Sequence, residues 1–203
     1  MILVGRYLSP YTRRVGATLK IFGMPYVHKP ASTITERDVI QSHNPLGRVP
    51  ALVLDDGETL IESAAILDHL DEVAGPAKAL IPTKGIERRR VLQILAVATG
   101  VLDKAVAGVY ERTRKSKDKV DEAWATRQDD QAKGGLAALE AACTPSWFVG
   151  ARMTQADVTV KCVVDFLKAA APALFPTGAY PRLEAFAQRL APHPAFAETP
   201  IEV

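Results

Sequence analysis

The first 75 residues alternate short apolar segments with amphipathic ones, in an order that restricts the possible folds. The apolar run at residues 2–7 predicts a buried strand, after which Ser9 and Pro10 are typical of a helix start and Gly23 of its end. Further strands are predicted at residues 26–31, 51–54 and 59–61, and further helices at residues 35–43 and 63–73. The predicted order is therefore βαβαββα, which indicates a small α/β domain.

The composition changes after this segment, and the rest of the chain has no predicted strand. Gly75-Pro76 and Ile81-Pro82 flank a stretch without periodicity, which indicates a linker. After it, apolar residues recur every three or four positions, the spacing of amphipathic helices. We therefore predict an α/β domain at residues 1–75, a linker at residues 76–85 and an all-helical domain at residues 86–203.

Two patterns in the helical part have a structural interpretation. Thr154 and Asp157 are spaced as a capping box, in which each side chain accepts a hydrogen bond from the other residue's backbone N–H. They predict the start of a core helix at residues 157–167, without contact to a substrate. Gly134 and Gly135 lie inside a second long helix and predict a kink, because each costs about 1 kcal/mol relative to alanine.

The composition disfavours several classes of partner. The formal net charge is +2 with 24% charged residues, so we expect no general attraction to nucleic acid or to a membrane surface. Cys143 and Cys162 are far apart and the four histidines are scattered, which predicts neither a disulfide framework nor a metal site. No apolar run reaches the length of a membrane span, and the apolar start is too short for a signal peptide. We therefore expect a cytoplasmic protein.

The segment Ser9-Pro10-Tyr11-Thr12 lies where the first predicted strand is followed by the first helix. A thiol–disulfide oxidoreductase has Cys-x-x-Cys in such a position, so Ser9 and Thr12 disfavour that activity. A helix N-terminus has unpaired N–H groups and a partial positive charge, which stabilise a thiolate. The Ser9 hydroxyl is therefore a candidate donor to the thiolate of a bound ligand. The alternative is that Ser9 only caps the helix.

A second candidate segment is Asn44-Pro45-Leu46-Gly47-Arg48-Val49-Pro50. Only roughly 5% of X-Pro bonds in folded proteins are cis, so Val49-Pro50 taken alone predicts a trans turn. The Asn-Pro and Gly positions make the loop tight, however, and Pro50 stands at the first position of a strand, which a sheet tolerates. A cis bond here would turn the N–H and C=O of Val49 toward a peptide-like ligand.

A third candidate segment is Glu62-Ser63, at the start of the last helix of the α/β part. Ser63 is a candidate cap, and the freed N–H groups of the helix would bind a carboxylate. Glu62 would pair with an ammonium group, so the two residues together predict a site for an amino-acid head group. The alternative is a simple cap beside a solvated Glu62.

In this order and spacing, the segments resemble the cytosolic glutathione transferase family, and in particular its bacterial serine-type members. The resemblance covers nearly the whole chain and rests on Ser9-Pro10-Tyr11 with Arg13-Arg14-Val15, on Asn44 to Pro50, on Glu62-Ser63-Ala64-Ala65-Ile66 and on Thr154-Gln155-Ala156-Asp157. It implies a thioredoxin-like N-terminal domain followed by an all-helical C-terminal domain. It also implies a homodimer whose substrates are glutathione and a hydrophobic electrophile, without a metal.

The resemblance further implies residues that bind glutathione. Val49 matches the residue before the family's cis-proline, here Pro50, whose backbone holds the cysteinyl part of glutathione. Glu62 and Ser63 match the residues that bind the γ-glutamyl group. Arg48 is a looser match to a position at which related sequences often have Lys or Gln, near the glycyl end of glutathione.

The resemblance leaves two candidates for the catalytic residue. Ser9 matches the catalytic position of the serine- and cysteine-type classes, and Ser9 and Tyr11 are both expected to contact glutathione. Tyr7 is the rival, because the tyrosine-type classes use a Tyr at the end of the first strand. We favour Ser9 because Ser-Pro-Tyr-x-Arg is the pattern of serine-type bacterial members. Serine instead of cysteine at this position argues against the thiol-transferring, omega-like subgroup.

The implied function is activation of the glutathione thiol for attack on an electrophilic small molecule, as in detoxification. A free thiol has a pKa near 8.5, and lowering it by about two units takes about 2.7 kcal/mol of preferential thiolate stabilisation. The Ser9 hydroxyl and the helix N-terminus are expected to supply it. Two alternatives stay open: a non-catalytic binding or regulatory protein of the same fold, and a glutathione-dependent isomerase or dehalogenase.

Overall fold

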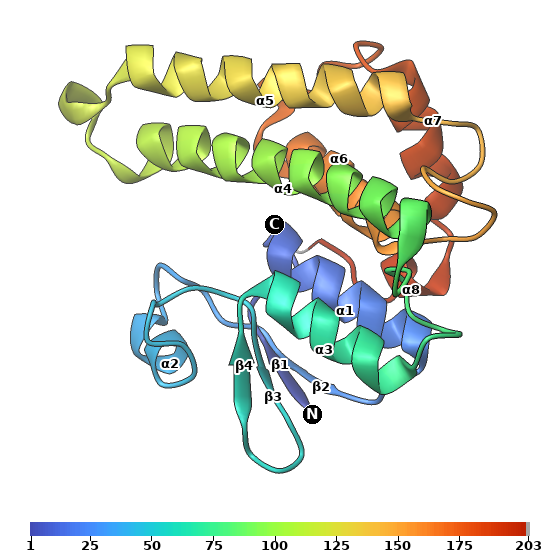
Figure 1. Ribbon diagram of the computed structural model, residues 1–203. Helices are drawn as coiled ribbons and strands as arrows, with labels where there is room; N and C mark the ends of the chain where they lie inside the picture. Colours follow the sequence, from blue (N-terminus) through green and yellow to red (C-terminus); the bar gives the residue numbers. More distant parts are fainter. Residues whose placement is uncertain (202–203) are drawn as a thin grey trace. The chain divides into compact units, whose positions relative to one another are not determined.

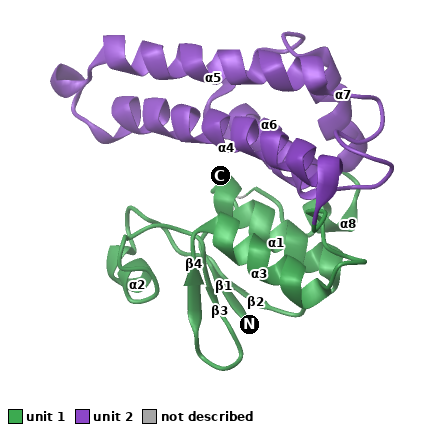
Figure 2. Ribbon diagram, viewed as in Figure 1, with its two compact units in different colours: residues 1–83, 191–203 green, residues 84–190 purple. Residues whose placement is uncertain are grey.

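The computed structural model describes residues 1–201 and consists of two compact units (Figures 1 and 2). Unit 1 contains residues 1–83 together with the described residues from 191 onward, and unit 2 contains residues 84–190. The C-terminal segment from residue 191, which the sequence assigns to the helical domain, therefore belongs to the α/β unit.

Unit 1 is built on a four-stranded sheet in the order β2-β1-β3-β4. Its strands are β1 (Ile2–Val4), β2 (Val27–Lys29), β3 (Ala51–Val53) and β4 (Thr59–Ile61). Its first three helices are α1 (Pro10–Phe22), α2 (Arg37–Gln41) and α3 (Ser63–Ala74). β1 runs parallel to β2 and antiparallel to β3, and β3 runs antiparallel to β4. The predicted order βαβαββα is confirmed, and α1 forms the crossover that a parallel pair requires.

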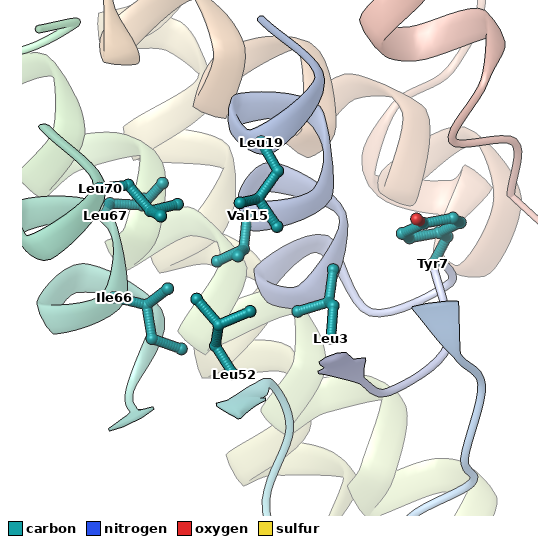
Figure 3. Close-up of a cluster of buried hydrophobic side chains, with 8 residues drawn as sticks. All are labelled: Leu3, Tyr7, Val15, Leu19, Leu52, Ile66, Leu67 and Leu70. Carbon is teal, nitrogen blue, oxygen red and sulfur yellow. The ribbon is translucent and has the colours of Figure 1, made fainter. Parts of the chain in front are cut away.

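Alternate residues of the central strands contribute to two apolar clusters. Leu3 and Leu52, which are paired between β1 and β3, pack with side chains of α1 and α3 (Figure 3). The members of this cluster are Leu3, Tyr7, Val15, Leu19, Leu52, Ile66, Leu67 and Leu70. Val4 and Ala51, the next pair along, join Ile40 of α2 in a second cluster. Because successive side chains of a strand point to opposite faces, α1 and α3 cover one face of the sheet and α2 the other.

The C-terminal segment is anchored to α1 by polar contacts. Its short helix α8 (Pro194–Ala197) packs against α1. Arg13 is buried, and its Nε donates to the carbonyl oxygen of Thr199 at 2.7 Å. Lys20 forms an ion pair with Glu198, with 2.7 Å between Nζ and Oε2. These contacts join residues from the two ends of the chain, which explains why local sequence patterns place the segment elsewhere.

The described part of unit 2 contains helices as its regular elements. These are α4 (Gly85–Arg114), α5 (Glu122–Ala142), α6 (Gln155–Ala170) and α7 (Pro181–Leu190), with the short 3-10 helices η1 (Lys117–Lys119) and η2 (Pro172–Leu174). α4 packs against α5 and α6, and α6 packs against α7. The predicted fold class, a thioredoxin-like domain and an all-helical domain, is confirmed.

Glycines allow α4 and α5 to pack closely. α5 runs as one helix through Gly134 and Gly135, where the sequence predicts a kink. A Cβ atom on Gly135 would lie 2.4 Å from Cγ2 of Val101 on α4. A Cβ atom on Gly108 of α4 would lie 2.8 Å from Oδ1 of Asp129 on α5. The helix propensity lost at Gly135 is therefore offset by close contact between the two helices.

α6 begins with the predicted capping box of Thr154 and Asp157, which is confirmed. Asp157 Oδ2 accepts hydrogen bonds from the N–H and the hydroxyl of Thr154, both at 2.8 Å, and Oδ1 accepts from the Phe148 N–H at 2.9 Å. Asp157 is fully buried, and this burial raises its pKa above the usual value although the three donors oppose the shift.

α4 is long and apolar enough to cross a membrane by length and composition alone, which the sequence analysis did not anticipate. One such helix gives little support for a membrane span, because core helices meet the same criterion. Here α4 buries residues such as Ala98, Leu102 and Ala105 and packs against two other helices of unit 2.

Candidate functional site

Three of the predicted site segments adjoin the same end of the sheet. Val4 pairs with Ala51, and Ala51 pairs with Ile61, so these residues form one row across β1, β3 and β4. Val4 is the last residue of β1, Ala51 the first of β3 and Ile61 the last of β4. The chain therefore leaves or enters this row through residues 5–12, 44–50 and 62–65, which we call the sheet-end cluster.

Ser9 is the N-cap of α1. Its backbone is extended (φ −68°, ψ 117°), and its Oγ accepts a hydrogen bond from the Thr12 N–H at 3.3 Å. Pro10 occupies the first turn, where its missing N–H leaves no helical hydrogen bond unmade. Ser9 is half-buried. Because its oxygen acts as the acceptor in the capping bond, the hydroxyl hydrogen is available to donate to another group.

Gly5 brings the start of α1 and the loop before β3 together. Its φ of +126° is a conformation that L side chains rarely adopt. A Cβ atom on Gly5 would lie 2.6 Å from Thr12 Oγ1 and 2.8 Å from Val49 Cβ, so both side chains pack directly against this backbone. Thr12 Oγ1 is buried and has no hydrogen-bond partner in the described part of the chain.

The peptide bond between Val49 and Pro50 is cis. This is the form that the tight loop and the resemblance imply, although the dipeptide taken alone predicts a trans turn. Pro50 is buried and Val49 is half-buried. Within residues 1–201, the hydrogen bonds of the neighbouring turns and strands use neither the N–H nor the C=O of Val49. Both backbone groups are therefore available to a ligand.

Asn44 shapes the loop that carries Val49, as the Asn-Pro position in the sequence predicts. Asn44 is buried, its Nδ2 donates to the carbonyl oxygen of Arg48 at 2.8 Å, and its Oδ1 accepts from the Leu46 N–H at 2.9 Å. Such bonds from Asn side chains to nearby backbone are a known source of tight turns, and that propensity is the signal in the sequence. The side chain of Arg48 is exposed.

Ser63 is the first residue of α3, and the prediction that it caps this helix is wrong. Glu62 is the N-cap, and no side-chain capping bond forms. The residue Ser63 is 1% exposed. Its Oγ instead accepts hydrogen bonds from Arg14 Nε at 3.2 Å and Arg14 Nη2 at 2.8 Å. Its hydroxyl donates to Glu62 Oε1 at 3.3 Å. The guanidinium on α1 thus binds the oxygen that a cap would use, a contact between distant residues that the sequence pattern does not contain.

Glu62 has an unusual backbone conformation. With φ 67° and ψ 115°, it has a positive φ that among the described non-glycine residues occurs here alone. Such conformations cost about 1–3 kcal/mol and are concentrated at functional sites. The Glu62 side chain is exposed beside the N-terminus of α3.

Tyr7 is part of the core of unit 1. It is 5% exposed, and its ring lies in the cluster of Figure 3 and stacks on the His28 ring with 3.8 Å between centroids. Its hydroxyl oxygen lies 2.7 Å from that of Tyr26. Burial raises the pKa of Tyr26, and the hydrogen bond with Tyr7 opposes that shift. The Tyr7 hydroxyl is therefore engaged inside the fold.

The chemistry available at the sheet-end cluster depends on which groups it contains. Tyr11 is half-buried in the first turn of α1. Unit 1 has no cysteine, so a thiolate at the N-terminus of α1 would have to come from a ligand. Among the described residues, no group of three or more His, Cys, Asp and Glu side chains is arranged to hold a metal ion.

Two family profiles match the chain. The profile of the glutathione S-transferase N-terminal domain matches residues 3–78, and that of the glutathione S-transferase C-terminal domain matches residues 122–189. The matched ranges lie in unit 1 and unit 2 respectively.

Individual relatives match over most of their length. The maleylacetoacetate isomerase of Pseudomonas aeruginosa is 30% identical over 208 residues, which covers 98% of this chain and 94% of the relative. A crystal structure of a glutathione transferase family member from Pseudomonas fluorescens Pf-5, with bound glutathione, is 30% identical and covers 100% of this chain and 99% of that chain, with a TM-score of 0.86. A glutathione S-transferase from Methylobacillus flagellatus, with glutathione bound, is 28% identical with a TM-score of 0.90 and covers 98% of both chains. From the two profiles and these near full-length matches, the chain belongs to the glutathione transferase family.

Proposed function

We propose that the protein binds glutathione at the sheet-end cluster and activates its thiol for attack on an electrophilic small molecule. The observation that carries the proposal is the row of Val4, Ala51 and Ile61. It brings the N-termini of α1 and α3 and the free backbone groups of Val49 to one end of the sheet. Helix N-termini favour anions, so this arrangement suits a ligand with a thiolate, a carboxylate and a peptide group between them.

The thiolate is proposed to lie at the N-terminus of α1, beside Ser9. The Ser9 hydroxyl would donate to the sulfur while its oxygen keeps the Thr12 bond. The partial positive charge of the helix N-terminus and the hydrogen bond from Ser9 both favour the thiolate over the thiol, so both lower the pKa of the bound thiol. In a substitution reaction, the sulfur would form a bond to the electrophilic carbon while a leaving group such as halide departs with its electron pair. The proton of the thiol would go to solvent.

The rest of glutathione is proposed to follow the other two segments. The N–H and C=O of Val49 would pair with the cysteinyl backbone, with Pro50 and Tyr11 beside it. The γ-glutamyl carboxylate would bind at the N-terminus of α3 with Ser63, and its ammonium group would pair with Glu62. Arg48, whose side chain is exposed, is proposed to lie near the glycyl carboxylate.

A glutathione-dependent isomerase is the second candidate function. It is favoured by the 30% identity to a maleylacetoacetate isomerase over 98% of this chain. The same thiolate would add reversibly to a conjugated carbon–carbon double bond, rotation would follow about the resulting single bond, and loss of the thiolate would regenerate glutathione. The thiolate site would therefore be the same, and the two functions differ in the second substrate.

We further infer that the protein works as a cytoplasmic homodimer in detoxification of hydrophobic electrophiles. Family membership supports this, and so does size, because unit 1 is a small domain and small domains bury a smaller fraction of their surface than large ones. Light scattering at micromolar concentration would check the oligomeric state. A mass near the 21.9 kDa of one chain, with activity intact, would contradict a required dimer.

The proposal is tested by retention on immobilised glutathione, followed by turnover assays with an aryl halide and with a cis-configured conjugated dicarbonyl compound. We expect retention that free glutathione reverses, and turnover of at least one substrate. Retention without turnover of any electrophile would favour a binding or regulatory protein. Absence of retention and of turnover would reject the proposed function.

A further inference from the structure

We infer that Arg14 is a positioning residue for the ligand carboxylate at the start of α3, and that it acts through the hydroxyl of Ser63. The inference rests on the proposed function, because it concerns the γ-glutamyl end of the same ligand. It assigns a role to the second arginine of Arg13-Arg14, a motif to which the proposed chemistry gives no task.

Arg14 determines which hydrogen bonds Ser63 is able to make. Its Nε and Nη2 donate to the same Ser63 oxygen, at 3.2 Å and 2.8 Å. A hydroxyl oxygen accepts two hydrogen bonds and donates one, so these contacts fill its acceptor capacity. The Ser63 hydroxyl is thereby restricted to donating. A group that only donates selects an anion or a carbonyl oxygen as its partner.

In the structure the acceptor of that hydrogen is Glu62, in a weak arrangement. The distance from Ser63 Oγ to Glu62 Oε1 is 3.3 Å, whereas hydrogen bonds from hydroxyls to carboxylates are usually about 2.5–2.7 Å. Glu62 is exposed and has the positive φ described above. A ligand carboxylate would replace Glu62 as the acceptor at a shorter distance. The Glu62 carboxylate, released from Ser63, would then pair with the ammonium group of the same ligand.

The charge of Arg14 supports the same assignment. Arg14 is 3% exposed, so water screens its positive charge poorly. The charge polarises the Ser63 hydroxyl and adds to the field of the α3 N-terminus, and both effects favour a carboxylate. Arg14 is too deeply buried to serve as a surface anchor, and its effect on the ligand is transmitted by Ser63.

The neighbouring Arg13 provides a matched control. It is also buried, at 4% exposure, but its Nε donates to the Thr199 carbonyl oxygen of the C-terminal segment. Substitutions of Arg13 and Arg14 thus remove the same type of buried donor from adjacent positions of α1. Only those of Arg14 remove the contact to Ser63.

The test compares glutathione with 4-aminobutyryl-Cys-Gly, which lacks the α-carboxylate and is otherwise the same peptide. Isothermal titration calorimetry is carried out on the wild type, on Arg14→Lys and Arg14→Gln, and on Arg13→Lys and Arg13→Gln. We expect both Arg14 variants to weaken glutathione binding about tenfold and to change binding of the analogue by less than about twofold. The Arg13 variants should bind both peptides within about twofold of wild type, with a lower melting temperature.

A double-mutant cycle with Ser63→Ala completes the test. If Arg14 acts through Ser63, adding Arg14→Lys to Ser63→Ala should weaken glutathione binding by less than about twofold beyond Ser63→Ala alone. Equal weakening for both peptides, additive effects in the cycle, or a wild type that binds the two peptides equally would overturn the inference while leaving glutathione binding in place. A wild type that binds neither peptide would overturn the proposed function, and the inference with it.

Discussion

The hydroxyl oxygens of Tyr7 and Tyr26 lie 2.7 Å apart, which makes the side chain of Tyr7, between β1 and α1, a structural element of unit 1. The ring of Tyr7 packs in the core cluster (Figure 3), and its hydroxyl bonds to that of Tyr26, which precedes β2. Ser9, in contrast, is half-buried at the N-terminus of α1. The two candidates for the catalytic hydroxyl therefore differ: the Tyr7 hydroxyl is engaged in a hydrogen bond beside the core, whereas the Ser9 hydroxyl is half-buried at a helix N-terminus.

Tyr7→Phe should lower the stability of the fold and leave turnover with glutathione close to normal. Loss of the hydrogen bond to Tyr26 is expected to cost about 1 kcal/mol, measured by urea unfolding. Tyr26→Phe, which removes the other hydroxyl, is the matched control and should behave alike. If Tyr7→Phe abolishes turnover and Ser9→Ala does not, the protein is a tyrosine-type enzyme and the assignment to Ser9 is wrong.

Glu62→Gly should stabilise the fold and weaken glutathione binding. The positive φ of Glu62 is unfavourable for an L side chain, so removal of its Cβ is expected to raise the unfolding free energy by about 1 kcal/mol. The lost carboxylate would at the same time remove the proposed partner of the ligand ammonium. Chemical denaturation and calorimetry measure the two effects. A variant that is less stable than wild type would show that the conformation of Glu62 is not strained.

Asp157→Ala should damage folding without affecting chemistry. It leaves three donors without their acceptor, the Phe148 and Thr154 N–H groups and the Thr154 hydroxyl, and we expect a loss of about 2 kcal/mol. Turnover per folded molecule should stay near normal. A variant as stable as wild type but without turnover would place Asp157 in the active site.

The pH dependence of stability gives a second test at this residue. Burial raises the pKa of Asp157 in the folded state, so that state keeps the proton to a higher pH than the unfolded chain does. The contribution of Asp157 to stability therefore falls as pH rises from about 3.8 to the raised value. Asp157→Asn, which does not ionise, should lose this decline. Parallel stability–pH curves for the two proteins would contradict the raised pKa.

Cys143 should react slowly with alkylating reagents in the native protein. Burial raises the pKa of this thiol to about 11, so only about 0.1% is ionised at pH 8. Mass spectrometry after iodoacetamide treatment should show little modification at pH 8 and more toward pH 11. Because the unfolded thiol ionises first, the stability contributed by Cys143 should be lost as pH rises between about 9 and about 11. Rapid, stoichiometric alkylation of the wild type at pH 8 that does not occur in Cys143→Ala would contradict the raised pKa of the Cys143 thiol.

Much of the fold follows from local sequence. The apolar runs at Leu3-Val4 and Ala51-Leu52 predict buried strands, and both are central in the sheet. Ser9 and Gly23 predict the ends of α1, where they act as N-cap and as a left-handed C-cap with φ 66°. Such signals are local because hydrophobic period and backbone conformation depend on neighbouring residues.

Contacts between residues that are distant in the sequence are the part of the structure that local sequence patterns do not predict. The Arg14–Ser63 and Arg13–Thr199 contacts decide how the start of α3 and the C-terminal segment are held, and each joins residues far apart in the chain. Gly135 looks like a helix breaker in the sequence, yet it makes room for Val101. These outcomes depend on packing between elements, which a single sequence does not specify. The sequence predicts the candidate residues Ser9, Val49 and Glu62, but it does not predict the hydrogen bonds from Arg14 to Ser63.

The central claim is that the N-terminus of α1 and the Ser9 hydroxyl stabilise a bound glutathione thiolate. The most direct measurement is the ultraviolet absorbance of the thiolate as a function of pH, with glutathione bound to the wild type and to Ser9→Ala. We predict a bound-thiol pKa about two units below the free value near 8.5 in the wild type, and a pKa at least about one unit higher in Ser9→Ala with glutathione affinity nearly unchanged. A bound thiol that titrates near the free value in the wild type, or identically in the two proteins, would contradict the claim.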